Sequence, residues 1–216
     1  MRRLILAVTL LAAPALAEDK PNLDQTAPAM PGAVALLLSA QNLYALGQTG
    51  KDALMVLTAA RMMRGLTLIP TSRTPETKGK PTSATLTLPD ATAMLMTAHT
   101  LADGDDLLPD LIESIASETP PQPKSLRVTP SQLDPGVTDT WTLQFYGGTY
   151  AELAIAGAGK GDLDLSVQDA KGNPICQDNG SADTATCGFT PKDNGDFTVT
   201  ITNSGITSDA YQLITN

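Results

Sequence analysis

The chain has 216 residues, of which 14 are basic and 23 are acidic, and its formal net charge is −9 at neutral pH. An acidic chain repels nucleic acids and anionic lipids, so its charge argues against nucleic-acid binding as a function. Every aromatic residue except Tyr44 lies beyond position 140, whereas every methionine lies at or before position 96. This uneven distribution predicts an α+β multidomain protein with two differently built hydrophobic cores.

Residues 1–17, MRRLILAVTLLAAPALA, have the pattern of a secretory signal peptide: a charged start, an apolar run and a small-residue end. Cleavage is expected between Ala17 and Glu18. The alternative, a membrane anchor, needs about 18 or more consecutive apolar residues, and Pro14 ends the run too early. The sequence therefore predicts an exported protein that spans no membrane after cleavage.

Two helical hairpins are predicted over residues 30–117, after a flexible, proline-containing segment over residues 18–29. Apolar residues recur at helical spacing in AVALLLSAQNLYALG, which follows Pro31, and again over residues 51–64. The same pattern of alanine and leucine returns over residues 91–117, which indicates an internal repeat. The helix lengths and the Ala/Leu spacing resemble tetratricopeptide-type helical repeats. Small alanines facing leucines also explain the pattern by close helix packing, without any ligand.

Residues 66–88 separate the two hairpins and are expected to form an insertion in the helical domain. This segment is rich in Thr, Pro, Ser and Lys between two short apolar pieces, LTLI and TLTL. The two pieces are predicted either to pair with each other as strands or to belong to a mobile loop. Connections longer than about 12 to 15 residues are usually functional or disordered.

A proline-rich linker is predicted over residues 118–124, followed by a β-sandwich over residues 125–216. The three prolines of ETPPQPK favour an extended, semi-rigid chain. Beyond the linker, apolar residues alternate with polar ones, as in WTLQF, and turn sequences such as KGNP and DNG separate the runs. Short alternating runs at this spacing predict an all-β antiparallel sandwich.

Six motifs follow one another in residues 138–216: WTLQF, YAELAIAG, GDLDLSVQDAKGNP, CGFTP, NGDFTVTITN and DAYQL. Their order resembles that of the bacterial pre-peptidase C-terminal domain. The resemblance implies a jelly-roll-like β-sandwich in a bacterial periplasmic or secreted protein. It also implies a class of module in which some members bind polysaccharide or structural protein and some hold calcium.

Cys176 and Cys187 are the only cysteines, and they flank the polar loop QDNGSADTAT. Because thiols oxidise in exported proteins, the pair is predicted to form a disulfide. The bond would close a short loop and raise the free energy of unfolding by about 2 to 3 kcal/mol in the chain-entropy account. A reactive dithiol is the alternative, but redox motifs usually place only two residues between their cysteines.

Asp162 and Asp164 alternate with leucines, so both carboxylates are expected on one face of a strand. Calcium takes about six to eight oxygen ligands, so Asp169, Asp178 and Asp193 would have to converge on the pair. The alternative is that these side chains accept hydrogen bonds from nearby turn amides. Calcium is the only cofactor for which the sequence provides candidates.

Trp141 is in phase with apolar strand neighbours, so a place in the core is expected rather than a sugar-stacking role. Tyr146 and Tyr150 flank a Gly-Gly turn and are candidates for contact with a glycan or a protein. His99 is the only histidine, and no hydrolase or zinc motif accompanies it. No catalytic residue is therefore assigned.

These features together predict a non-enzymatic binding or scaffolding protein of the bacterial envelope. In this hypothesis the helical domain engages a protein partner, and the sandwich anchors or presents it. An alternative is a module that binds extracellular polysaccharide, with or without calcium. A carboxylate-based hydrolase is the second alternative, because the chain has 23 acidic residues, although none of them is paired in a distinctive setting.

Overall fold

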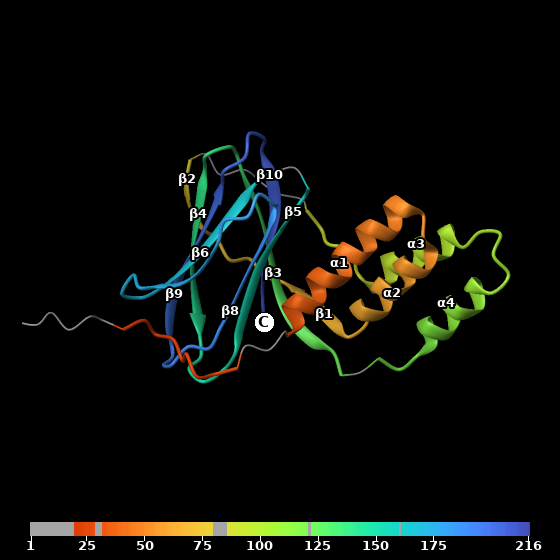
Figure 1. Cartoon of the computed structure of the whole chain (residues 1–216), viewed down its shortest axis with the longest axis horizontal. Helices are drawn as coiled ribbons and strands as arrows, with labels where there is room; N and C mark the ends of the chain where they lie inside the picture. Colours follow the sequence, from red (N-terminus) through yellow and green to blue (C-terminus); the bar gives the residue numbers. More distant parts are fainter. Residues whose placement is uncertain (1–19, 29–31, 80–85, 121, 160) are drawn as a thin grey trace, which may run out of the picture.

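The computed structural model describes residues 20–28, 32–79, 86–120, 122–159 and 161–216. A helical layer and a β-sandwich lie side by side (Figure 1). The helices are α1 (Ala33–Gly50), α2 (Ala53–Met63), α3 (Ala91–Leu101) and α4 (Leu108–Ser117). The strands are β1 (Leu66–Pro70), β2 (Glu76–Lys78), β3 (Lys124–Leu133), β4 (Thr138–Phe145), β5 (Ala151–Gly157), β6 (Leu163–Asp169), β7 (Pro174–Asp178), β8 (Thr184–Phe189), β9 (Gly195–Asn203) and β10 (Asp209–Thr215).

The predicted signal peptide, including the cleavage point between Ala17 and Glu18, lies outside the described residues. Within the described ranges, no helix combines the length and the apolar character that a membrane crossing requires.

Local sequence sets the ends of several helices. The carboxylates of Asp52 and Asp90 begin α2 and α3, because each accepts a hydrogen bond from a backbone N–H in the first turn. The two bonds, to Met55 and Ala93, are 2.9 and 2.8 Å long. Such N-caps satisfy amides that have no partner inside the helix. Helices occur in all four segments where apolar spacing predicts them.

Two five-stranded sheets face each other in the sandwich. The strand order is β1-β3-β10-β5-β8 in sheet A and β2-β4-β9-β6-β7 in sheet B. Of the strand pairs in the described part of the chain, only β1 and β3 run parallel. The predicted antiparallel β-sandwich is therefore confirmed at the level of the fold.

Apolar side chains between the two sheets form the core of the sandwich. Trp141, Phe197 and Tyr211 are the largest side chains buried there. The rings of Phe145, Phe189 and Phe197 pack together, with centroids 5.1 to 5.6 Å apart. Trp141 thus lies in the core, as its place in the alternating pattern predicts.

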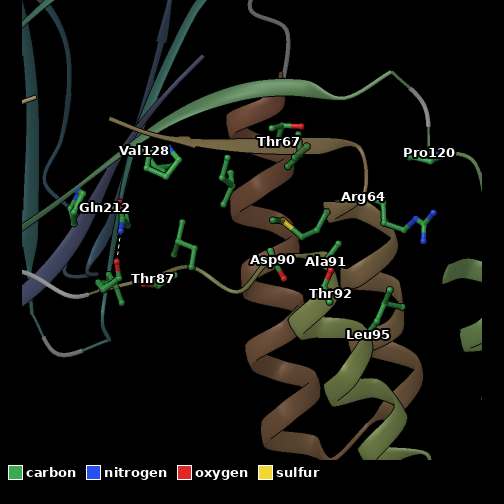
Figure 2. A pocket seen from close by; sticks show the side chains of 17 residues that line it. Arg64, Thr67, Thr87, Asp90, Ala91, Thr92, Leu95, Pro120, Val128 and Gln212 are labelled. Carbon is green, nitrogen blue, oxygen red and sulfur yellow. Dashed lines mark hydrogen bonds between the residues drawn. The ribbon is translucent and has the colours of Figure 1, made fainter. Parts of the chain in front are cut away.

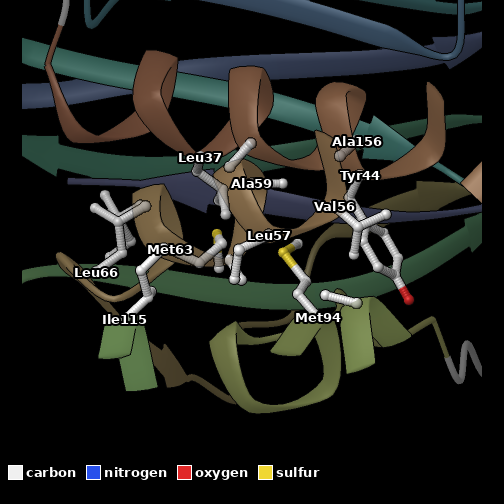
Figure 3. Packing of buried hydrophobic residues seen from close by; sticks show 14 of the residues in the cluster. Leu37, Tyr44, Val56, Leu57, Ala59, Met63, Leu66, Met94, Ile115 and Ala156 are labelled. Carbon is white, nitrogen blue, oxygen red and sulfur yellow. The ribbon is translucent and has the colours of Figure 1, made fainter. Parts of the chain in front are cut away.

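The helices share a second core with the outer face of sheet A (Figure 3). Leu37, Leu57 and Met63 from α1 and α2 are buried in it, together with Ala154 and Ala156 of β5. As a result, β5 is buried on both faces from Ala151 to Ala156. A strand covered on both sides needs no polar alternation, which explains the run AELAIAG.

The segment 66–88 is not an insertion confined to the helical layer. LTLI, with Pro70, forms β1 and pairs with β3 rather than with TLTL, and residues 76–78 form β2 at the edge of sheet B. The predicted pairing of the two apolar pieces is therefore wrong. β3 offers a full-length partner edge, and pairing there buries Leu66 between the helices and sheet A. The sandwich consequently includes two strands that precede the expected range of 125–216.

Residues 20–28 belong to the segment expected to be flexible, yet they contact the sandwich closely. The side-chain amide of Asn22 exchanges two hydrogen bonds with the backbone of Asp193, over 2.9 and 2.8 Å. The N–H of Asp24 donates to the carbonyl of Thr190 over 2.8 Å, and Leu23 packs against the sandwich core. This segment therefore covers one end of the sandwich.

Candidate functional site

The predicted disulfide between Cys176 and Cys187 is present, with the two Cα atoms 6.1 Å apart. Cys176 lies on β7 at the edge of sheet B, and Cys187 lies on β8 at the edge of sheet A. The bond therefore joins the two sheets covalently along one side of the sandwich.

The structure does not gather the calcium candidates into a metal site. Asp162 precedes β6, and Asp164 accepts a hydrogen bond from the Ser204 hydroxyl. Among the residues that the structure describes, no group of three or more acidic, His or Cys side chains is arranged to hold a metal ion. Asp169 and Asp178 accept hydrogen bonds from turn amides, as in the alternative interpretation. Calcium binding stays a prediction.

Asp169 organises the end of the sandwich that the N-terminal segment covers. Its carboxylate accepts hydrogen bonds from the backbone N–H groups of Asn22, Lys171 and Asn173, each 2.9 Å long. Burial opposes ionisation of Asp169, but the hydrogen bonds from Asn173, Asn22 and Lys171 outweigh burial and lower its pKa. Asp169 therefore acts as a structural anion that holds three segments together.

The two tyrosines proposed as ligand contacts do not form one site. Tyr146 is 65% exposed in the turn after β4. Tyr150 lies against Gly188 of β8 and lines a cleft of about 280 Å³ with Val34 and Glu152, but Tyr146 does not line that cleft. Burial and then the negative charge of Glu152 raise the pKa of the Tyr150 hydroxyl. Their role as ligand contacts stays a prediction.

An exposed apolar surface, here called the tip patch, lies on α3 and α4 at the end of the helical layer away from the sandwich (Figure 1). It consists of Met96, Leu107 and Leu111, which are 68%, 79% and 42% exposed. Leu107 and Leu111 are four residues apart, which places them on one side of α4. Beside Met96 is a cavity of about 400 Å³, which His99 and Ile112 also line.

Acidic residues border the tip patch. Asp105 accepts hydrogen bonds from the backbone N–H groups of Leu107 and Leu108, over 2.8 and 2.9 Å. These bonds, of which that from Leu108 is the stronger influence, lower the pKa of Asp105. The tip patch is therefore an apolar surface with an acidic rim, and the rim has the following exposed members: Asp103, Asp105, Asp106, Asp110 and Glu113.

A second apolar surface, here called the interlayer cleft, lies between sheet A and the helices (Figure 2). Its volume is about 800 Å³. Figure 2 shows β1 on one side of it and the chain that leads into Asp90 and α3 on the other. The cleft is lined mainly by apolar side chains, including Met63, Leu66, Leu68, Leu88, Leu95 and Val128.

A third surface, here called the polar groove, runs between α1 and β8 and has a volume of about 750 Å³. It lies beyond the segment of residues 86–89, which lines both this groove and, through residues 86–88, the interlayer cleft. The side chains that line it are rich in hydroxyl, amide and carboxylate groups, among them Ser39, Asn42, Gln48, Asp178, Asp183 and Thr186.

No protein-family model matches the chain, and no curated protein matches it. Among solved structures, the pre-peptidase C-terminal domain of a collagenase from Bacillus anthracis matches 40% of this chain and 86% of its own, with 15% identity and a TM-score of 0.32. The periplasmic g-type lysozyme inhibitor PliG from Aeromonas hydrophila matches 42% of this chain and 84% of its own, with 12% identity and a TM-score of 0.32. A carbohydrate-binding module of Cellvibrio mixtus lichenase 5A matches 39% and 73%, with 11% identity and a TM-score of 0.28. The resemblance to the pre-peptidase C-terminal domain is thus matched by a weak likeness of fold alone.

Proposed function

We propose that this protein is an exported, non-enzymatic binding module whose tip patch holds a protein partner. The observation that carries the proposal is the exposure of Met96, Leu107 and Leu111 at one end of the helical layer. Single exposed apolar side chains are ordinary, but a group of them beside a cavity is typical of an interaction surface. The acidic rim favours a partner whose own apolar surface is bordered by Lys and Arg.

Export is supported by the predicted signal peptide over residues 1–17 and by the disulfide, since such bonds persist in oxidising compartments. A non-enzymatic role is supported by the state of the buried carboxylates. Asp139, Glu152 and Asp169 each accept at least two hydrogen bonds from neighbouring groups. Such saturated carboxylates serve as structural acceptors rather than as free acids or bases.

The test is crosslinking of the tagged protein in its native envelope, comparing three forms: the natural protein, the double variant Leu107→Asp with Leu111→Asp, and Ile206→Asp. Ile206 is a matched control because it is 93% exposed but lies in a loop of the sandwich. We expect one partner that is captured by the natural protein and by the Ile206 variant and is lost with the double variant. Equal capture by all three forms would contradict the proposal.

The polar groove favours polysaccharide binding as a second candidate function. Hydroxyl, amide and carboxylate groups line it, and such groups form the directional hydrogen bonds by which sites recognise polar ligands. Asn42 and Gln48 are exposed on α1. If this candidate is right, the protein binds members of a glycan array, and the double variant Asn42→Ala with Gln48→Ala loses that binding. An array without any bound glycan would exclude it.

A further inference from the structure

The outer side of β1 carries backbone groups that face no partner strand. β1 is an edge of sheet A, and β3 is the one strand that pairs with it in the described part of the chain. The N–H of Thr71 donates to the carbonyl of Val128 over 2.8 Å, so the odd-numbered residues of this segment face β3. Because backbone groups alternate in direction along a strand, the N–H and C=O groups of Leu66 and Leu68 point away from β3.

The interlayer cleft opens beside this free edge. Leu66 and Leu68 line it, and Leu88 and Leu95 line it from the side of α3. In Figure 2 the chain around Thr87 and Asp90 runs opposite β1 across the cleft. A segment lying in the cleft would therefore have the outward backbone groups of β1 next to it and apolar side chains around it.

Gln212 contributes an unpaired acceptor to the same cleft. The residue is 5% exposed and lines the cleft from β10. Its side-chain N–H donates to the carbonyl of Leu86, whereas its side-chain oxygen is buried and accepts no hydrogen bond within the described residues. A buried acceptor without a donor is costly, so a donor that enters the cleft is favoured at this position.

The charged groups that line the cleft are already engaged. The guanidinium of Arg64 donates to the backbone carbonyls of Ala116 and Glu118. The carboxylate of Asp90 caps α3 through the N–H of Ala93. The cleft thus favours an occupant that has apolar side chains and both donors and acceptors of its own, but no charge within the cleft.

We propose that the interlayer cleft binds an extended peptide segment of a partner protein, which pairs with the outer side of β1 and donates a hydrogen bond to Gln212. An extended peptide supplies alternating donors, acceptors and apolar side chains in one segment. A helix has its backbone groups bonded internally, and a lipid chain has none. Pro70 lacks an N–H, so the pairing covers Leu66 and Leu68 and is shorter than β1, which has five residues.

The test uses the full mature protein and a phage-displayed library of random linear nonapeptides. Selected peptides are synthesised and titrated against the natural protein and three variants. Leu68→Pro removes the outward donor without touching the groups that face β3, and Gln212→Leu removes the acceptor. Ile69→Thr is the matched control, because Ile69 is outside the cleft lining and its backbone faces β3.

We expect the natural protein and the Ile69 variant to bind equally, and the Leu68 and Gln212 variants to bind about tenfold more weakly each. In the complex, the amide hydrogens of Leu66 and Leu68 should exchange with solvent more slowly than in the free protein. The unfolding midpoint, followed by the fluorescence of Trp141, identifies any variant that has lost its fold. If Leu68→Pro does not fold, Gln212→Leu and the exchange data decide.

Three results would overturn the proposal: no enrichment of peptides, equal affinity for the Leu68 and Gln212 variants, or bound peptides that leave the exchange of Leu66 and Leu68 unchanged. The inference is independent of the tip patch. The double variant Leu107→Asp with Leu111→Asp should bind the selected peptides as the natural protein does. Loss of peptide binding in that variant alone would assign the peptides to the tip patch and reject the cleft as their site.

Discussion

The carboxylate of Glu152 on β5 accepts a hydrogen bond from the backbone N–H of Gly32 at the start of α1, over 2.8 Å. Its other oxygen accepts from the N–H of Val34, over 3.2 Å. Gly32 has no side chain with which to cap the helix, so a residue 120 positions further along the chain caps it instead. Because Glu152 is buried, this cap ties the helical layer to sheet A at a defined point.

Loss of this cap should destabilise the whole protein. We expect Glu152→Ala to lower the free energy of unfolding by about 2 kcal/mol, because two amides lose a charged acceptor. Gly32→Ala should also destabilise, since its Cβ would lie 2.1 Å from the Glu152 carboxylate. Urea unfolding measures both, with the exposed Glu113→Ala as control. If the two effects simply add in the double variant, the residues are not coupled and this interpretation is wrong.

Tyr211→Phe should loosen the sandwich core. The Tyr211 hydroxyl donates to Asp139 over 2.5 Å and accepts from the indole N–H of Trp141 over 3.1 Å. Removing it leaves both groups a partner short, so we expect the free energy of unfolding to fall by about 1 to 3 kcal/mol. Fluorescence of Trp141, the single tryptophan, follows the transition directly. Tyr146→Phe, at an exposed position, should unfold like the natural protein.

The same hydroxyl gives a prediction about alkaline pH. Burial, followed by the charge of Asp139 and its hydrogen bond, raises the pKa of Tyr211 far above the ordinary value. Because the folded-state pKa is the higher one, stability is retained below the ordinary tyrosine pKa and falls as the pH rises above it. Tyr211→Phe should therefore reduce the alkaline decline in the free energy of unfolding. An unchanged slope would show that other groups cause that decline.

Asp105 should make the start of α4 sensitive to acid. Hydrogen bonds from Leu108 and Leu107 lower its pKa in the folded state. Its contribution is therefore present above the pKa of the unfolded chain and is lost as the pH falls through the lower, folded value. We expect the amides of Leu107 and Leu108 to gain exchange rate as the acid transition is crossed. Asp105→Ala should abolish this transition and Asp106→Ala should keep it; the reverse result would assign the transition to Asp106.

Reduction of the disulfide should separate the edges of the two sheets. Cys176 and Cys187 are 11 positions apart, a loop for which chain entropy gives about 2 to 3 kcal/mol of stability. The double variant with both cysteines changed to Ser should unfold at correspondingly lower urea, and a reducing agent should affect only the natural protein. Equal urea midpoints for the reduced and oxidised natural protein would contradict this.

Local patterns in the sequence predict the helices, most strands and the disulfide, because each depends on residues close together in the chain. Asp52 and Asp90 are recognisable caps of this kind. The cap by Glu152 was missed because it comes from a distant strand. A signal for it exists, since Glu152 is a lone charge within the apolar run AELAIAG and Gly32 begins a helix without a capping side chain.

Two features depend on what covers what, and sequence spacing does not contain that information. The partners of β1 and β2 are strands far along the chain, so the two apolar pieces of residues 66–88 look like partners of each other. Leu107 and Leu111 have the spacing of an ordinary buried helix face. Their exposure follows from the absence of any described segment that packs over that side of α4.

The chain enters the sandwich twice. It supplies β1 and β2 before it forms α3 and α4, and it returns at Lys124 to build the remaining strands. A fragment that began at Ser125 would leave β3 and β4 without their outer neighbours and would expose Leu126 and Val128. Recombination therefore could not transplant this sandwich or these helices separately. The unit that evolution can copy, exchange or lose is the whole interleaved chain.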